Sequence, residues 1–281
     1  MLLAAGRGVR MRPLTDHTPK PLLEVGGKAL IVWHIENLLR AGIHEIVINH
    51  AHLGAQIENA LGDGSRFGAH IQYSPEAFAL ETAGGIANAR YLLGDQPFAV
   101  INGDIFCDYD FAQLPPRATA LQAKGDTAHL VMVDNPTQHP DGDFALNNFR
   151  IVPPTPLSPP LSGEKLNASP VSPPDKGGGG LGGVSVLTFS GIGIYHPALF
   201  KDIPRGSITP LAPLLRAQIA LGKVSGEHHS GRWTDVGTLQ RLAELDQQLR
   251  LSQPQPSPNH APEYPPEYPP EYPPEYPNDP R

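Results

Sequence analysis

The sequence predicts an α/β fold in which a mostly parallel sheet is flanked by helices. Short apolar runs with strand character alternate along the chain with segments whose apolar residues recur at helical spacing. Glycine follows many of these segments, as expected for the loops between them. Strands that alternate with helices form parallel sheets covered on both faces, and such sheets bind ligands beyond the carboxyl ends of their strands.

The individual elements follow in order. The apolar run at residues 2–5 predicts a first strand that ends in a glycine-rich turn. Helices are expected where apolar side chains recur at i, i+3 or i+4 before a glycine. The predicted helices span 29–39, 53–61 and 85–93. The further predicted strands span 45–49, 69–73, 98–102, 128–133, 144–152 and 184–189.

Two proline-rich segments interrupt this pattern. Residues 151–183 hold 8 of the 33 prolines and residues 252–281 hold 12. Proline cannot join a sheet ladder, and glycine runs are too flexible to pack. The sequence therefore predicts one domain over 1–250, with a disordered insert over 153–183 and a disordered Pro-Pro-Glu-Tyr repeat tail over 252–281. Partner binding by either segment is the alternative.

Composition excludes several classes of protein. The formal net charge is −7, of which the tail carries −4, so the body lacks the basic surface of a nonspecific nucleic-acid binder. The single Cys107 cannot form an internal disulfide, and no apolar run is long enough for a membrane span. The N-terminus lacks a signal-peptide pattern. We expect a cytoplasmic protein without nucleic-acid or membrane partners; the oligomeric state is open, with a monomer slightly favoured.

The loop after the first predicted strand is a candidate phosphate site. Residues 3–15 combine small residues, which permit close backbone approach, with three arginines that could join the backbone N–H groups in holding phosphate. Met11 stands where a dinucleotide fingerprint needs its third glycine, and no Walker A lysine follows. On the loop alone, a glycine turn with solvated arginines is favoured. The arginines are Arg7, Arg10 and Arg12.

Three charged residues outside this loop are further candidates for the phosphate or metal site. Lys20 stands between Pro19 and Pro21, which are expected to fix an extended backbone and to limit where the ammonium can go. A lysine this close in sequence to the arginine loop suggests a second cation on the same phosphates. Asp104 ends a predicted strand after a glycine, and Asp235 lies far away in sequence. Taken alone, Asp104 is typical of a turn and Asp235 of a helix cap.

These segments together resemble the nucleotide-sugar pyrophosphorylases, a family of nucleotidyltransferases. The resemblance covers nearly all of residues 1–250 apart from the insert, and is carried by 3–15, 19–22, 81–86, 101–104, 189–192 and 233–238. Further segments resemble one branch, the uridylyltransferases of peptidoglycan recycling, at 48–50, 61–68, 108–111, 142–144 and 226–228. The resemblance implies a Rossmann-like sheet of the nucleotide-diphospho-sugar transferase type. It also implies that UTP and a sugar 1-phosphate are the substrates.

The resemblance assigns roles to individual residues. It implies a Mg²⁺ ion held by Asp104 and Asp235, with Arg10 and Lys20 as the catalytic cations. The nucleotide-binding residues would be Ala4, Ala5, Gly6, Gly8, Val9, Arg10, Lys20, Glu76, Gly84, Gly85 and Asn102. The sugar-phosphate residues would be Asp143, Ser190 and Gly191. Structural roles remain the alternatives: a helix-entry turn for 83–85, a strand end for Asn102, and surface turns for the sugar-phosphate residues.

Two alternatives to the uridylyltransferase interpretation stay open. One is a nucleotidylyltransferase for another hexose 1-phosphate, such as glucose or mannose, with UTP, dTTP or GTP. The other is a noncatalytic nucleotide-sugar sensor, against which the retained aspartates and cations argue. The twelve histidines have no metal-ligand spacing. Cys107 has no apparent histidine partner and is expected to be a buried small hydrophobe. His228 and His229 are expected at the surface.

Overall fold

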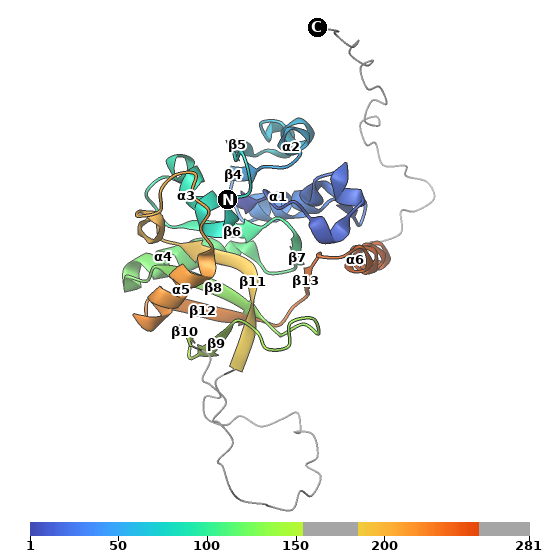
Figure 1. Cartoon of the computed structure of the whole chain (residues 1–281). Coiled ribbons are helices and arrows are strands. Elements are labelled where there is room, and N and C mark those ends of the chain that lie inside the picture. The colour runs from blue at the N-terminus through green and yellow to red at the C-terminus, as the bar shows by residue number, and fades with distance from the viewer. Residues whose placement is uncertain (154–184, 253–281) are drawn as a thin grey trace, which may run out of the picture.

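The computed structural model describes residues 1–153 and 185–252 (Figure 1). Within these residues, nine strands form the main sheet in the order β5-β4-β1-β6-β11-β8-β12-β10-β9. The first five in chain order are β1 (Leu2–Leu3), β4 (Glu45–His50), β5 (His70–Pro75), β6 (Phe98–Asn102) and β8 (Ala128–Val133). The others are β9 (Phe144–Asn147), β10 (Arg150–Val152), β11 (Ser185–Tyr195) and β12 (Val224–His229).

Two short strand pairs and six α-helices complete the described part of the chain. The pairs are β2 (Glu24–Val25) with β3 (Lys28–Ala29), and β7 (Ile105–Cys107) with β13 (Trp233–Asp235). The helices are α1 (Leu30–Arg40), α2 (Gly54–Leu61), α3 (Glu81–Leu93), α4 (Leu114–Lys124), α5 (Leu211–Ala220) and α6 (Leu239–Ser252).

The predicted α/β fold is confirmed, but the sheet is mixed rather than mostly parallel. β5, β4, β1 and β6 run parallel, while β11 runs antiparallel to β6 on one side and to β8 on the other. The pairing of β9 with both β10 and β11 closes a ring with β8 and β12. Helical crossovers connect the parallel half. In the antiparallel half of the described sheet only β9 and β10 form a hairpin, and β11 pairs with β6, β8 and β9 across long connections.

Two apolar clusters cover opposite faces of the parallel half. Adjacent residues of β6 point to opposite faces, as in any strand: Ile101 packs in the cluster that contains Ile31 and Ile35 of α1. Its neighbour Val100 packs in the cluster that contains Ile86 of α3 and Leu215 of α5. The sheet is therefore covered on both faces, which leaves its strand ends as the place for a ligand.

A third apolar cluster fastens α6 to the first part of the chain. Leu245 and Leu249 of α6 pack with Val25 of β2 and with Val236, which directly follows β13. In addition, Asp246 Oδ1 accepts a hydrogen bond of 2.8 Å from the backbone N–H of Gly26. The C-terminal helix thus holds the loop region after β1 against the β7–β13 pair (Figure 1).

The expectation of one strand over 144–152 is wrong. β9 and β10 form a hairpin there, and its two turn residues, Asn148 and Phe149, have φ angles of 44° and 62°. Two left-handed residues at this place make the type I′ turn that matches the twist of paired strands.

Of the two strands within 144–152, β9 pairs antiparallel with β11, whereas β10, which directly precedes the predicted insert, lies on the other side of β9. The predicted disorder of the insert and tail concerns residues that lie almost entirely outside the described part of the chain.

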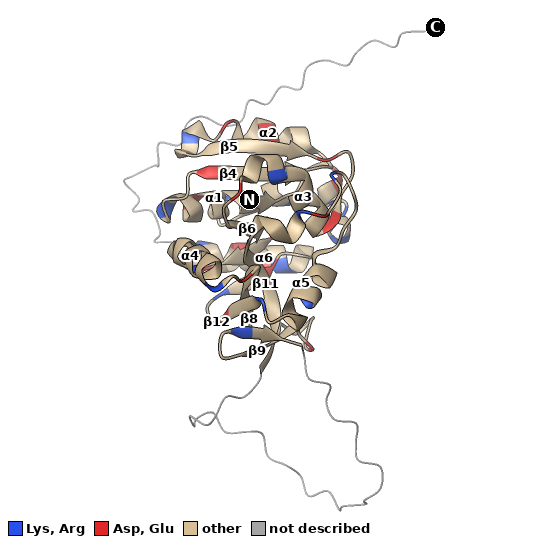
Figure 2. Ribbon diagram, turned by 90° about the vertical axis from the view of Figure 1, so that its left-hand side faces the viewer, with Lys and Arg blue, Asp and Glu red and all other residues tan. Residues whose placement is uncertain are grey.

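Charged residues of both signs are spread over the view in Figure 2 and do not gather into one basic face. Among the described residues, no helix combines the length and the apolar character that crossing a membrane requires.

Candidate active site

Two adjoining cavities lie at the carboxyl ends of β1, β4 and β6, where ligands of such sheets bind. The first has a volume of about 270 Å³ and the second of about 300 Å³. Asn102, the last residue of β6, and Asp104 line both cavities. A ligand in the first cavity would therefore lie directly beside a ligand in the second.

The loop after β1 forms one wall of the first cavity. Residues 4–6 line it, and the backbone N–H of Ala4 donates a 3.0 Å hydrogen bond to Asn49 Oδ1. The loop then turns at Gly8, whose φ of 61° favours glycine and whose carbonyl accepts a 2.8 Å hydrogen bond from Thr15 Oγ1. The small residues thus lie against the cavity, as predicted, and the loop is fixed by its own hydrogen bonds.

A buried carboxylate forms the opposite wall. Glu76 Oε1 accepts a hydrogen bond of 2.6 Å from Asn49 Nδ2, and its Oε2 accepts one of 3.0 Å from the backbone N–H of Leu80. Burial raises the pKa of Glu76 despite these hydrogen bonds, which favour the charged form. A Cβ at Gly85 would lie 2.8 Å from both Asn49 Nδ2 and Glu76 Oε1, so only glycine lets α3 approach this wall.

The turn expected before a helix over 83–85 is wrong, because α3 begins at Glu81 and includes these residues. The backbone N–H of Gly84 donates a 3.0 Å hydrogen bond to the carbonyl of Thr209, and a Cβ at Gly84 would collide with the carbonyl oxygen of Ser207. Glycine allows the close packing of α3 against this loop. Direct contact of Gly84 and Gly85 with a nucleotide stays a prediction.

Lys20 and Asp104 meet at the junction of the two cavities. Lys20 Nζ lies 2.6 Å from Asp104 Oδ2, and the lysine side chain is 7 % exposed while the aspartate is 40 % exposed. The buried ammonium is neutralised by a carboxylate that still faces the cavities. Lys20 begins a 3₁₀ turn over Lys20–Leu22, so the expectation of an extended backbone at this residue is wrong. The action of Lys20 on a phosphate stays a prediction.

The β7–β13 pair brings Asp235 to the same cavity as Asp104. Asp235 is paired in register with Ile105, and the backbone N–H of Val236 donates a 3.0 Å hydrogen bond to the carbonyl of Asp104. Both carboxylates line the second cavity. Asp235 Oδ2 also accepts a 2.9 Å hydrogen bond from Arg241 Nη1 of α6.

Arg10 lies on the same side of the second cavity as Asp235. It belongs to the short 3₁₀ turn Val9–Met11, lines the second cavity and is exposed. Its Nη2 would lie 3.0 Å from a Cβ at Gly237, two residues after Asp235, so the guanidinium lies against the chain there. The fold thereby brings the arginine loop and the predicted metal ligands together.

A bulge in β11 forms the floor of the second cavity. The pairing of β11 with β8 shifts register between Phe189 and Ile192. Gly191 there has a φ of 85°, and a Cβ on it would lie 2.6 Å from Asn102 Nδ2. The carbonyl of Ser190 accepts a 2.8 Å hydrogen bond from Trp233 Nε1 of β13. The bulge is thus fixed between β6 and β13.

Asp143 supports this floor from outside. Its Oδ2 accepts a 2.8 Å hydrogen bond from the backbone N–H of Phe189, and its Oδ1 lies 3.2 Å from His139 Nε2. His139 and Phe189 line the second cavity. Asp143 therefore positions residues of the cavity, and its own contact with a ligand stays a prediction.

Most predicted site residues converge on these cavities, and several further residues join them. Six predicted residues line neither cavity: Gly8, Val9, Gly84, Gly85, Asp143 and Gly191. Several further residues that hold or line the site have no role assigned from the sequence; Asn49 and Trp233 lie within segments that carry the resemblance, whereas nothing in the local sequence marks the others. The residues without an assigned role are Asn49, His139, Thr188, Trp233 and Arg241.

Small residues, cations and paired carboxylates at a strand-end edge are typical of enzymes that bind nucleoside phosphates. Residues 1–141 match the family described as nucleotidyl transferase. The N-acetylmuramate alpha-1-phosphate uridylyltransferase of Neisseria meningitidis is 53 % identical over 245 residues, 87 % of this chain and 95 % of that protein. The protein of the same name from Caulobacter vibrioides is 31 % identical over 90 % of this chain and 96 % of its own length.

Comparison with solved structures also finds nucleotidyltransferases. A Bacillus anthracis crystal structure assigned as a glucose-1-phosphate thymidylyltransferase superposes with a TM-score of 0.68 over 89 % of this chain and 94 % of that one, at 22 % identity. The chain belongs to the nucleotidyl transferase family.

Proposed function

We propose that the protein transfers a uridylyl group from UTP to N-acetylmuramate α-1-phosphate, forming UDP-N-acetylmuramate and pyrophosphate. The observation that carries this proposal is the convergence of Lys20, Asp104, Asp235 and Arg10 where the two cavities join. The relatives named for this reaction, one of them 53 % identical, support the choice of substrates. Since UTP is a cytoplasmic nucleotide, the proposed reaction takes place in the cytoplasm.

The proposed chemistry is an in-line displacement at phosphorus. A phosphate oxygen of the sugar 1-phosphate forms a bond to the α-phosphorus of UTP, and the bond from that phosphorus to the bridging oxygen of pyrophosphate breaks. The nucleophile is already an anion, so no general base is required. The residues contribute positioning and charge neutralisation.

The first cavity is proposed as the nucleotide site. The backbone of residues 4–6 would lie against the triphosphate, with the wall of Asn49 and Glu76 beside the nucleoside. Lys20 would neutralise the attacked phosphate, and Arg10 would stabilise the departing pyrophosphate. Asn102, which lines both cavities, is suited to contact both substrates.

The second cavity is proposed as the sugar-phosphate site. Its floor at Ser190 and Gly191 offers backbone groups, while Asp143 fixes the adjoining Phe189. Asp104 and Asp235 fit the hard oxygen donor set that Mg²⁺ prefers, and they would hold the ion. When bound, Mg²⁺ would neutralise charge on the reacting phosphates. Residues 1–250 are proposed to act as one catalytic unit in the monomer.

A substrate panel tests the proposal. The purified protein is incubated with Mg²⁺, a nucleoside triphosphate and a sugar 1-phosphate, and pyrophosphate release is measured. The triphosphates are UTP, dTTP and GTP, and the sugars are N-acetylmuramate, glucose and mannose 1-phosphates. Turnover is expected to be fastest with UTP and N-acetylmuramate 1-phosphate. Preference for another pair would change the substrate assignment, and binding without turnover would indicate a sensor.

A further inference from the structure

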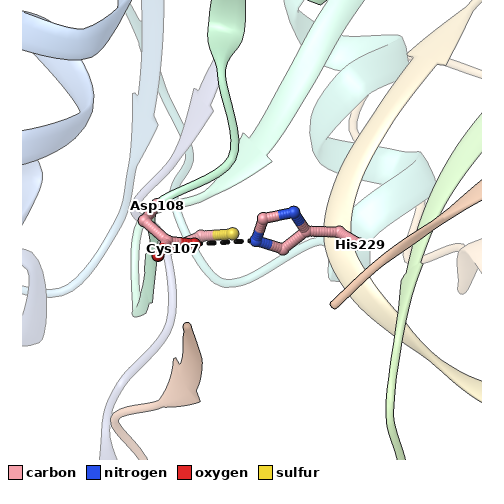
Figure 3. A group of neighbouring side chains, drawn as sticks. All are labelled: Cys107, Asp108 and His229. Atoms are coloured by element: carbon pink, nitrogen blue, oxygen red, sulfur yellow. Dashed lines mark hydrogen bonds and ion pairs between the residues drawn. The ribbon is translucent and has the colours of Figure 1, made fainter. Parts of the chain in front are cut away.

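A second group of metal-binding side chains lies outside the two cavities. The Sγ of Cys107, a carboxylate oxygen of Asp108 and a ring nitrogen of His229 all lie within 4.8 Å of one another (Figure 3). This corrects the expectation that Cys107 has no histidine partner. Sequence spacing could not reveal the pair, because His229 ends β12 while Cys107 ends β7.

The three side chains are held by interactions around them. His229 Nε2 lies 2.8 Å from Asp108 Oδ1, and the backbone N–H of Tyr109 donates a 3.4 Å hydrogen bond to Cys107 Sγ. The ring of Tyr109 packs edge-on against that of His229, with 5.6 Å between ring centroids. The backbone N–H of Asp108 donates to the carbonyl of Arg232, 3.1 Å away. The cluster is therefore fixed by backbone and ring contacts.

The surroundings leave room for an ion. A Cβ at Gly231 would lie 2.6 Å from His229 Nε2 and would also collide with the Asp108 carboxylate, so glycine keeps this side of the cluster open. On another side, Cys107 and Asp108 line a cavity of about 340 Å³ beside α1, which offers a path for entry. The nearest cation, Arg232, lies with its Nε 4.0 Å from Asp108 Oδ2.

We propose that Cys107, Asp108 and His229 bind a transition-metal dication, for which Zn²⁺ is the ion that this donor set favours. Thiolate, imidazole and carboxylate are the ligands of zinc sites, with metal–ligand distances of roughly 2.0 to 2.3 Å. Three protein ligands leave a fourth tetrahedral position for water. The Cys107 thiol releases its proton to bulk water as the metal–sulfur bond forms.

This site is chemically distinct from the paired aspartates at the cavities. Mg²⁺ prefers oxygen ligands, whereas a cysteine and a histidine select borderline-soft ions. The bound ion would join the end of β12 to β7, whose residues pair in register with Trp233 and Asp235 of β13. Zn²⁺ is therefore expected to stiffen the strand pair beneath the catalytic carboxylates without entering the reaction.

Cobalt substitution tests the site in the full chain. Co²⁺ bound to a thiolate gives a near-ultraviolet charge-transfer band, and Cys107 is the only cysteine in the sequence, so the band reports this site alone. With Mg²⁺ in excess to occupy oxygen sites, the wild-type protein is expected to develop the band at one Co²⁺ per chain and to lose it when Zn²⁺ is added. Zn²⁺ is also expected to raise the melting temperature.

Matched variants locate the ligands. Cys107→Ser and His229→Gln are expected to abolish the band and the Zn²⁺-dependent rise in melting temperature. His228→Gln is the control, because the neighbouring histidine instead faces Asp134, 2.9 Å from its Nε2. Circular dichroism confirms that each variant is folded, and the wild-type titration stands if one is not. Absence of the band in the wild type, or its persistence in His229→Gln, would overturn the proposal.

Discussion

The two aspartates proposed as metal ligands already have basic partners. Lys20 is 2.6 Å from Asp104 Oδ2, and Arg241 is 2.9 Å from Asp235 Oδ2. Such pairs keep two carboxylates close together without strong mutual repulsion. In the proposed reaction Lys20 would neutralise the attacked phosphate, so its pairing with Asp104 would hold the ammonium in place before the substrates bind.

Removing either carboxylate charge should therefore abolish turnover. Asp104→Asn and Asp235→Asn are each expected to lower Mg²⁺-dependent kcat by at least ~10³-fold, because each removes a proposed metal ligand. Asp134→Asn is the control, since Asp134 is 76 % exposed at its side chain and pairs only with His228 among the described residues. Pyrophosphate release measures the rates. A variant that retains more than about a tenth of the wild-type rate would not have lost a metal ligand.

Substitution of Gly6 tests whether the nucleotide lies close to the backbone of the loop after β1. A Cβ at Gly6 would meet no protein atom within 4 Å, and the residue lines the first cavity. Gly6→Ala is therefore expected to leave the melting temperature unchanged while it raises KM for UTP about tenfold, or about 1.4 kcal/mol. Gly85→Ala is the contrasting variant, because its Cβ would overlap the Asn49–Glu76 wall and destabilise the fold. An unchanged KM in Gly6→Ala would place the triphosphate elsewhere.

The sequence predicts most of the residues at the cavities, but not their supports. Residues 4–6, Lys20 and Asp104 lie in the motifs that carry the family resemblance, and it is the resemblance, rather than the local composition, that assigns them to the site. Arg241 lies on a regular helix, where nothing local distinguishes a supporting residue from a surface residue. Asn49 lies in the segment 48–50 that carries the resemblance, but its contact with Glu76 has no signal in the sequence. Such residues become visible only when the fold places them beside a partner far away in sequence.

Among the individual elements, β12 is anchored by a carboxylate that carries several hydrogen bonds. Glu227 Oε1 accepts a 2.6 Å hydrogen bond from the Tyr109 hydroxyl, and Oε2 accepts one of 2.5 Å from Arg117 Nη2 of α4. Burial acts to raise the pKa of Glu227, but hydrogen bonds from His129, Arg117 and Tyr109 outweigh it and lower the pKa to about 2. The element is thus fixed by an ionised side chain.

This shift makes the contribution of Glu227 depend on pH. The pKa is depressed on folding, so the stabilisation is present above the unfolded value of 4.5 and is lost as pH falls toward about 2. Glu227→Gln should lower the free energy of unfolding at pH 7 by about 3 kcal/mol, and the difference from wild type should shrink on acidification. Urea unfolding between pH 7 and pH 3 measures it. Glu45→Gln, at a 78 % exposed side chain, is the control; a difference independent of pH would refute the role of the charge.

The hairpin of β9 and β10 contains a strained residue. Phe149 has a φ of 62° and is 71 % exposed, so it bears the cost of a left-handed conformation without burying its ring. Phe149→Gly creates the Asn-Gly turn that such hairpins favour and should stabilise the protein by about 0.5 to 1 kcal/mol. Thermal unfolding measures the gain. Phe149→Ala keeps the strain and should give none; equal gains in both variants would show that the ring, not φ, is unfavourable.

At the level of the whole molecule, periodicity predicts the parallel half better than the antiparallel half. The strands around β1 and β6 are joined by helices and have regular patterns, so their order along the chain indicates their pairing. The pairing of β11 with β6, β8 and β9 depends on which strands meet across long connections, and local patterns contain no information on that choice. Within 144–152 the two-residue turn at Asn148 and Phe149 has no glycine to mark it, so the sequence predicts one strand there.

The pairing of β9 with both of its neighbours determines how the chain can be shortened between them. β10 and β11 each run antiparallel to β9, so they are parallel to one another, with Val152 and Ser185 on opposite sides of β9. A two-residue turn joins only adjacent antiparallel strands. A linker that joins Val152 directly to Ser185 must cross β9, which takes two strand spacings or roughly 10 Å, and must then turn back so that β11 runs in the same direction as β10. A two-residue Asn-Gly turn in place of this segment is therefore too short.

Replacing 154–184 with a Gly/Ser linker of about twelve residues should preserve the fold and both KM values, because a parallel crossover needs about that length. The shorter loop should change the free energy of unfolding by less than about 1 kcal/mol, since closure entropy depends only logarithmically on length. An Asn-Gly replacement should destabilise the protein by breaking a pairing of β9. Thermal unfolding and pyrophosphate kinetics compare the two variants. If KM for the sugar phosphate rose above ~10-fold in the long-linker variant while KM for UTP held, the replaced residues would belong to the sugar site.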